Sequence, residues 1–115
     1  MTELLRVTED WHGEVPIARV DGEVDASNVA ELGARIRRLL TNRSTTLVID
    51  LSRTTYMDSA GINLLFTIGE ELRGRQQVLH LVIPEASPVG RMLSITGADK
   101  VHPTHRVLED ALPHV

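Results

Sequence analysis

The first stretch of the chain carries apolar residues with the short period of β-strands. Residues 4–8 and 15–20 alternate or cluster apolar side chains, and Asp10-Trp11-His12-Gly13 separates the two runs. Short apolar runs bounded by turn residues are typical of paired strands. We therefore predict an opening hairpin with Trp11 in its turn.

A helical period follows a break at Asp21-Gly22. Apolar residues then recur three and four positions apart, which predicts a helix over residues 28–40 with Ser27 or Asn28 as its N-cap. The stripe consists of Val29, Leu32, Ile36, Leu39 and Leu40. A third strand is predicted over residues 46–51, where branched apolar residues dominate.

The second half alternates between helical and strand lengths. Helical spacing predicts a helix over residues 59–73, ending near Gly74 as a C-cap. A strand over 78–83 is closed by Pro84, because proline cannot donate to a β-ladder. A helix from Pro88 to a left-handed cap at Gly97 follows. The last elements are a short strand near 104–106 and a tail helix over 108–112.

The element order is thus β-β-α-β-α-β-α-β-α. Strands that alternate with helices after an opening hairpin predict an α/β fold, a mixed β-sheet with helices packed on it. The 115 residues are enough for one domain with its own core and too few for two.

Composition narrows the possible functions. Hydrophobic residues make up 42% of the chain and aromatic residues only 3%, so Leu, Ile, Val and Ala must build the core. The net charge of −4 and the scarcity of aromatic rings argue against a nucleic-acid partner, which a basic surface and stacking rings would attract.

Other features remove further classes of function. The chain has no cysteine, which excludes disulfides, thiolate metal sites and cysteine nucleophiles. No segment approaches the roughly 18 uninterrupted apolar residues of a membrane helix, and residues 1–6 do not resemble a signal peptide. We expect a cytoplasmic protein without membrane insertion. His102 and His105 lack an adjacent acidic ligand, so we expect no metal site and no cofactor.

One junction carries candidate chemistry. The apolar period changes between Ser52 and Ser59, so a polar loop is predicted there and Asp58 and Ser59 straddle a helix start. The first turn of a helix has unpaired N–H groups and a partial positive charge, which suit a carboxylate, a phosphate or a hydroxyl. From the residues alone, capping is the commoner role for such a serine. Asp50 and Asp58 have structural interpretations too, Asp50 ending a strand and Asp58 capping the helix.

Ser59 does not fit an enzyme nucleophile. A nucleophile elbow requires Gly-x-Ser-x-Gly, and Met57 occupies the first glycine position. Neither of the common glycine-rich phosphate loops is present. We predict no catalytic residues and no enzymatic activity.

Three segments in order resemble the STAS domain of the anti-sigma factor antagonist family. Asp58-Ser59-Ala60-Gly61 resembles that family's phosphorylation motif. Gly22-Glu23-Val24-Asp25 resembles its Gly-x-x-Asp loop, and residues 89–111 resemble its closing portion. The resemblance covers nearly the whole chain and implies a single STAS domain over residues 1–115. The departures are Asn63 for a frequent glycine, Ala98 for a larger apolar residue, and a bulkier Tyr56.

The resemblance implies a phosphorylation switch. Ser59 would be the phosphoacceptor, at the centre of a partner-binding surface that comprises Gly22, Asp25, Asp58, Ser59, Ala60 and Gly61. The unphosphorylated domain would bind an anti-sigma factor that is also a serine-protein kinase, and so release a sigma factor. A PP2C-type phosphatase would reset the switch. For Asp25, a simple turn role has equal weight.

Two alternatives remain open from the sequence. The domain could be a STAS interaction subunit of a stress-signalling scaffold or ABC transporter, using the same surface without phosphorylation. It could also bind a small ligand, a nucleotide or lipid, in a pocket between the helix over 59–73 and its neighbouring loops.

Overall fold

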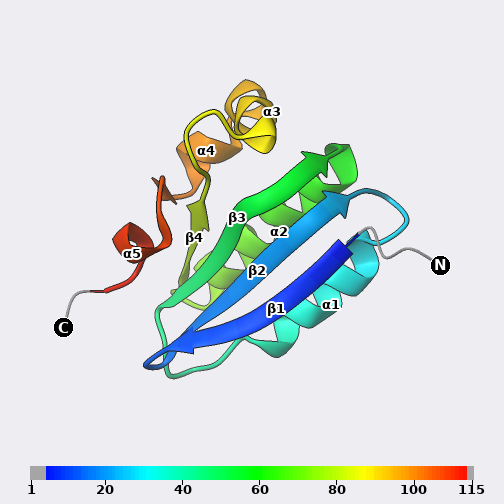
Figure 1. Cartoon of the computed structure of the whole chain (residues 1–115). Coiled ribbons are helices and arrows are strands. Elements are labelled where there is room, and N and C mark those ends of the chain that lie inside the picture. Colours follow the sequence, from blue (N-terminus) through cyan, green and yellow to red (C-terminus); the bar gives the residue numbers. More distant parts are fainter. Residues whose placement is uncertain (1–4, 114–115) are drawn as a thin grey trace.

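The computed structural model describes residues 5–113 of the chain. It shows a five-stranded sheet with helices packed on it (Figure 1). The elements are β1 (Leu5–His12), β2 (Val15–Val24), α1 (Val29–Arg38), β3 (Thr46–Met57), α2 (Ser59–Gly74), β4 (Val78–Val82), α3 (Pro88–Thr96), α4 (Ala98–Val101), β5 (Thr104–His105) and α5 (Leu108–Ala111). Strands follow one another in the order β1-β2-β3-β4-β5. β1 pairs antiparallel with β2, and every later pair is parallel. The prediction of a mixed α/β sheet is confirmed.

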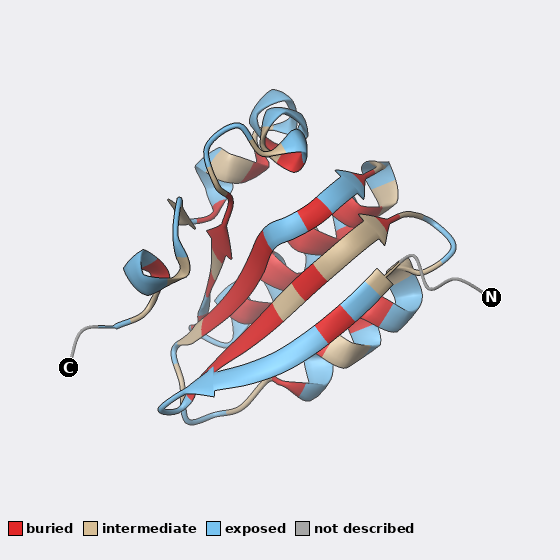
Figure 2. Cartoon of the chain, in the orientation of Figure 1, coloured by how far each residue is buried: buried red, intermediate tan, exposed pale blue. Residues whose placement is uncertain are grey.

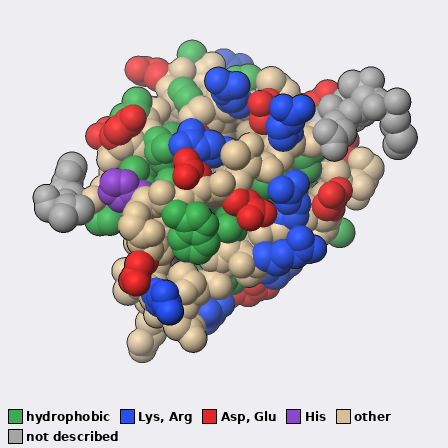
Figure 3. All heavy atoms as spheres, turned by 60° about the horizontal axis from the view of Figure 1, so that its bottom comes forward, with side chains coloured by type: hydrophobic (Ala, Val, Ile, Leu, Met, Phe, Trp, Pro, Cys, Tyr) green, Lys and Arg blue, Asp and Glu red, His purple; other side chains and the backbone are tan. Residues whose placement is uncertain are grey.

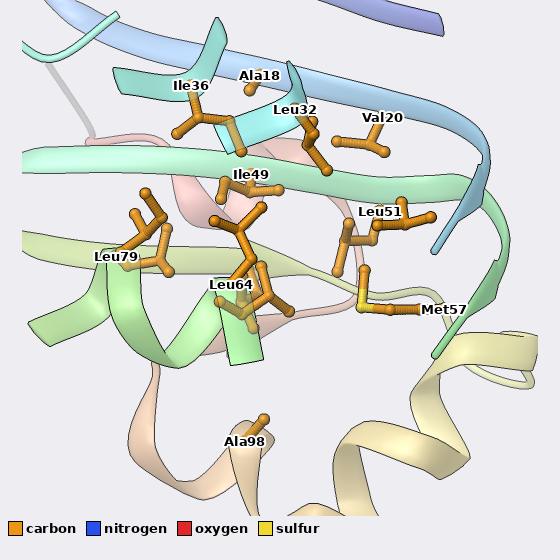
Figure 4. Close-up of a cluster of buried hydrophobic side chains, with 14 of the residues drawn as sticks. Ala18, Val20, Leu32, Ile36, Ile49, Leu51, Met57, Leu64, Leu79 and Ala98 are labelled. Carbon is orange, nitrogen blue, oxygen red and sulfur yellow. The ribbon is translucent and has the colours of Figure 1, made fainter. Parts of the chain in front are cut away.

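The side chains of each inner strand point alternately to two apolar layers. Leu47, Ile49 and Leu51 of β3 belong to the main core, on the face that α1 and α2 cover (Figures 1 and 4). Val48 belongs to a smaller cluster on the opposite face, where Ala111 of α5 packs. Residues 15–18 of β2 and 47–51 of β3 are buried without interruption, whereas β1 is largely exposed (Figure 2).

The hairpin turn lies further along the chain than predicted. β1 and β2 pair up to His12 and Val15, which leaves Gly13-Glu14 as the turn. Trp11 is therefore a strand residue, and half of its surface is exposed. The prediction of a turn at Trp11 was wrong because β1 is an edge strand whose exposed polar residues hide the apolar alternation. Leu4, where the predicted strand began, lies outside the described residues.

β2 and β3 are both longer than predicted. Each continues to the edge of the functional junction, β2 to Val24 and β3 to Met57. Gly22 has φ +110° and lies at an irregularity in the β2–β3 register, so the glycine bends the strand without ending it. Polar residues beyond Leu51 still pair with β2. The polar loop predicted between Ser52 and Ser59 is therefore mostly strand.

Helix ends agree with the predictions in part. Gly97 has φ +82° and caps α3, as predicted. α2 ends at Gly74, but the left-handed residue beyond it is Gln76, with φ +60°. α4 is an additional helix of four residues, too short to produce a periodic pattern. α1 is shorter at both ends than the predicted range of residues 28–40.

Candidate functional site

The parallel pairing of β2 with β3 brings the two motif segments together. Glu23 pairs with Tyr56 and Val24 with Met57, so Asp25 and Asp58 follow directly on neighbouring strand ends. The Asp58 N–H donates to the Val24 carbonyl at 3.2 Å, which extends the ladder by one bond. The loop before α1 and the start of α2 therefore lie side by side at the carboxyl ends of β2 and β3.

Asp58 caps α2, as predicted. Its backbone is extended, and its Oδ1 accepts from the Ala60 N–H at 2.9 Å and from the Gly61 N–H at 3.3 Å. Ser59 is the first residue of α2, and it is exposed. Two of the amides expected to be open at this helix start are thus occupied by Asp58. The carboxylate of Asp58 therefore fills the anion-binding position that these two amides form.

Gly61 fits where no larger residue would. A β-carbon at this position would lie 2.5 Å from Met57 Cγ and 2.9 Å from Val24 Cγ1, closer than van der Waals contact permits. Both neighbours are buried at the strand ends. The glycine of the motif therefore lets the first turn of α2 pack directly on the ends of β2 and β3, which sets the position of Ser59. Ala60 beside it is partly buried.

Asp25 organises the loop before α1. Its Oδ1 accepts from both the N–H and the hydroxyl of Ser27. The Ser27 hydroxyl is the main cause that lowers the pKa of Asp25, with the Ser27 N–H next. This arrangement is an Asx-type turn, which supports the turn interpretation. Asp25 is nonetheless only partly buried, so its negative charge is available at the surface.

Asn28 is the N-cap residue of α1, one of the two candidates predicted from the sequence, but its side chain makes no capping hydrogen bond. Instead, Asn28 Oδ1 accepts from the Asp25 N–H at 3.0 Å, and Asn28 Nδ2 donates to the Glu23 carbonyl at 2.9 Å. Asn28 therefore closes the loop on itself. The sequence signal was an asparagine three residues after an aspartate, a spacing that suits a local side-chain turn as well as a cap.

Gly22 and Tyr56 differ in how they contribute to this region. Gly22 lies inside β2, where its positive φ requires glycine, and its carbonyl accepts from the Thr55 hydroxyl at 3.2 Å. Gly22 therefore contributes through the conformation of its backbone. Tyr56 is 50% exposed one residue before buried Met57. From the sequence, Tyr56 was noted only as a departure from the family pattern, and its exposure was not predicted.

The other singled-out residues lie elsewhere. Asp50 is within β3, not at its end, and its carboxylate is buried and accepts from the Ser52 N–H at 2.9 Å. His102 is buried against Phe66 of α2, whereas His105 stacks on His80 of β4. Within residues 5–113, no three His, Asp or Glu side chains are arranged to hold a metal ion.

The charge distribution on the surface and the apolar character of the helices bear on possible partners. On the face shown in Figure 3, acidic and basic side chains are interspersed. In the described part of the chain, no helix is both long and apolar enough to cross a membrane.

Comparison with known proteins agrees with this geometry. A family model described as "Mlab, STAS domain" matches residues 7–109. The anti-sigma-F factor antagonist RsfB of Mycobacterium tuberculosis is 31% identical over 111 residues, which cover 96% of this chain and 89% of RsfB.

Solved structures show the same fold. The crystal structure of an anti-sigma factor antagonist from Mycobacterium paratuberculosis matches with a TM-score of 0.83 and 27% identity, covering 93% of this chain and 90% of that one. The Bacillus cell fate determinant SpoIIAA in its phosphorylated form matches with a TM-score of 0.65 and 22% identity, covering 92% and 96% of the two chains. The chain therefore belongs to the STAS domain family and, within it, to the anti-sigma factor antagonists.

Proposed function

We propose that this domain is a partner switch in which phosphorylation of Ser59 ends binding to an anti-sigma factor. The observation that carries the proposal is the exposed Ser59 hydroxyl at the first position of α2. Ser59 lies at the carboxyl ends of β2 and β3, which Asp25 and Asp58 directly follow. Unphosphorylated, this surface binds the anti-sigma factor and so frees a sigma factor. The likeness to RsfB, an anti-sigma-F factor antagonist, supports this class of partner.

The covalent step requires a kinase, which we assign to the anti-sigma factor itself. The Ser59 oxygen attacks the terminal phosphorus of ATP, ADP leaves, and the hydroxyl proton passes to a base on the kinase. Such a base must lie within hydrogen-bond reach of the hydroxyl, and in protein kinases it is a carboxylate. Binding therefore places a partner carboxylate next to Ser59.

Repulsion between that carboxylate and a phosphate on Ser59 explains why the anti-sigma factor is released. Phosphoserine carries about −1.5 to −2 charges at neutral pH. Two like unit charges about 4 Å apart repel by roughly 4 kcal/mol at an effective dielectric constant near 20, which corresponds to about a thousandfold in affinity. Asp58 already occupies the Ala60 and Gly61 amides, so these amides do not neutralise the new charge. No large conformational change is needed.

Reversal requires a separate phosphatase, and a PP2C-type enzyme fits this role. A domain of this fold can carry phosphate without losing its structure, since SpoIIAA was solved in a phosphorylated form.

The proposal is tested by mapping phosphate on the protein isolated from its native cells under growth and stress conditions. Peptide-level mass spectrometry should find phosphate on Ser59, with an occupancy that changes with the condition. Persistent absence of phosphate from Ser59 would contradict the switch and would leave the same surface as a permanent interaction site.

A further inference from the structure

The chain contains a second concave site that lies away from Ser59. A cleft of about 740 Å³ opens between α3, α4 and β5 and is bordered by the β4–α3 loop. Pockets for small organic ligands usually enclose about 300–1,000 Å³. The cleft is therefore much larger than a single inorganic ion needs. No residue of α2 lines it, so it is not the pocket that the sequence analysis considered.

Two arginines give this cleft its chemistry. Arg91 of α3 and Arg106, which follows β5, both line it, and both are exposed. Neither forms an ion pair with a carboxylate of residues 5–113, in contrast to Arg19, Arg35 and Arg37. The whole chain has a net charge of −4, whereas this cleft is lined by two unpaired guanidinium groups and one carboxylate, that of Asp99, and is therefore locally positive. Guanidinium groups match the geometry of phosphate oxygens.

Hydroxyl groups add donors in the same place. Ser87 and Ser94 line the cleft. The Ser87 oxygen accepts from the Val89 N–H at 3.2 Å, which leaves its O–H free to donate. The Gly90 N–H already donates to the Ser87 carbonyl. An anion in the cleft would therefore be bound by side chains and not by the amides at the start of α3.

Asp99 indicates that the ligand carries a hydrogen-bond donor in addition to its phosphate group. Of the described residues that line the cleft, it is the one acidic residue, and it is only partly buried. None of the ion pairs among residues 5–113 involves it. A ligand hydroxyl or amino group can donate a hydrogen bond to this carboxylate, so an organic phosphate that carries such a group would bind more tightly than inorganic phosphate.

We infer that this cleft binds a small organic phosphate. Arg91 and Arg106 contact the phosphate group, and Asp99 accepts a hydrogen bond from a hydroxyl or amino group elsewhere on the ligand. The inference is independent of the Ser59 switch, because it uses different residues and a different ligand.

The test is an NMR titration of the full chain labelled with ¹⁵N, at constant ionic strength. The probes are inorganic phosphate, glucose 6-phosphate and glucose. Saturable amide shifts are expected around Ser87, Ser94 and Arg106 with both phosphates, with tighter binding of glucose 6-phosphate and none of glucose. Equal binding of the two phosphates would overturn the assignment of an organic ligand. Non-saturable shifts would show surface ion association only and overturn the site itself.

Variants assign the contacts. Arg91→Gln and Arg106→Gln should each weaken glucose 6-phosphate binding about tenfold, the usual effect of one charged hydrogen bond. Arg43→Gln removes an exposed arginine outside the cleft and should change nothing. Equal effects of all three variants would contradict the inference. Asp99→Asn should reduce the preference for glucose 6-phosphate over phosphate; equal weakening of both would overturn the role of Asp99.

Discussion

The α-carbon of Gly61 packs against the side chain of Met57 so closely that a β-carbon at position 61 would lie 2.5 Å from Met57 Cγ. We expect Gly61→Ala to lower the free energy of unfolding by about 1–3 kcal/mol, the usual cost of overpacking a core. Urea denaturation measures this change. The control is Gly74→Ala, because a β-carbon there meets no atom within 4 Å and the substitution favours a helix by up to about 1 kcal/mol. Equal destabilisation by the two variants would contradict the packing argument.

The Asp58 cap has a separate energetic effect. Asp58→Ala removes the acceptor of the Ala60 and Gly61 amides, and we expect a loss of about 1 kcal/mol. Asp58→Ser keeps an oxygen that can cap the helix and should retain most of that stability. Thermal or urea unfolding distinguishes the two variants. If Asp58→Ser is as unstable as Asp58→Ala, the carboxylate does not act through the cap.

Gln76 is a position where the chain can be stabilised. The Gln76 N–H donates to the Arg73 carbonyl and the Gln77 N–H to the Leu72 carbonyl, which is the Schellman arrangement that favours glycine at the left-handed position. Gln76 has φ +60°. We expect Gln76→Gly to raise the free energy of unfolding by about 1 kcal/mol. An unchanged or lower urea midpoint would contradict this expectation.

The stacked pair His80 and His105 predicts a pH dependence. Their ring centroids are 5.2 Å apart, and His80 Nδ1 lies 3.0 Å from His105 Nε2, so one nitrogen donates while the other accepts. Burial first, and then the charge of His105, lowers the pKa of His80. The folded state thus binds a proton less readily than the unfolded state does. Stability contributed by His80 is present above its unfolded pKa of about 6.5 and is lost as the pH falls below that value.

This pH dependence is measured by urea unfolding of the wild type and of His80→Gln at a series of pH values. The wild type should lose more stability than the variant as the pH falls from about 7 to about 5. Parallel curves for the two proteins would show that the stacked pair makes no contribution.

The sequence predicted most elements because their apolar periods were long enough to recognise. α2 and α3 were placed correctly from helical spacing, and Gly97 from its position after α3. The ends of β2 and β3 were missed, since both are rich in polar residues and carry no continuous apolar run; these residues are partly buried in β2 and mostly exposed in β3. Their pairing depends on the neighbouring strand, which local composition does not encode.

The candidate site was predictable in part. The motif placed Asp58 at the helix start, and the structure confirms its cap. The hydrogen bonds of Asn28 to the Asp25 loop could not be separated from a helix cap by spacing alone. The exposure of Tyr56 follows from the strand extension that the sequence analysis missed.

The central claim is that charge on Ser59 controls partner binding. The most direct measurement is the affinity of the anti-sigma factor for four forms of the domain: unphosphorylated, phosphorylated on Ser59, Ser59→Ala and Thr45→Asp. Thr45 is exposed and precedes β3, so it lies at the opposite end of that strand from Ser59. We expect wild-type affinity for Ser59→Ala and Thr45→Asp, and about thousandfold weaker binding of the phosphorylated form. Equal affinity of the phosphorylated and unphosphorylated forms would contradict the switch.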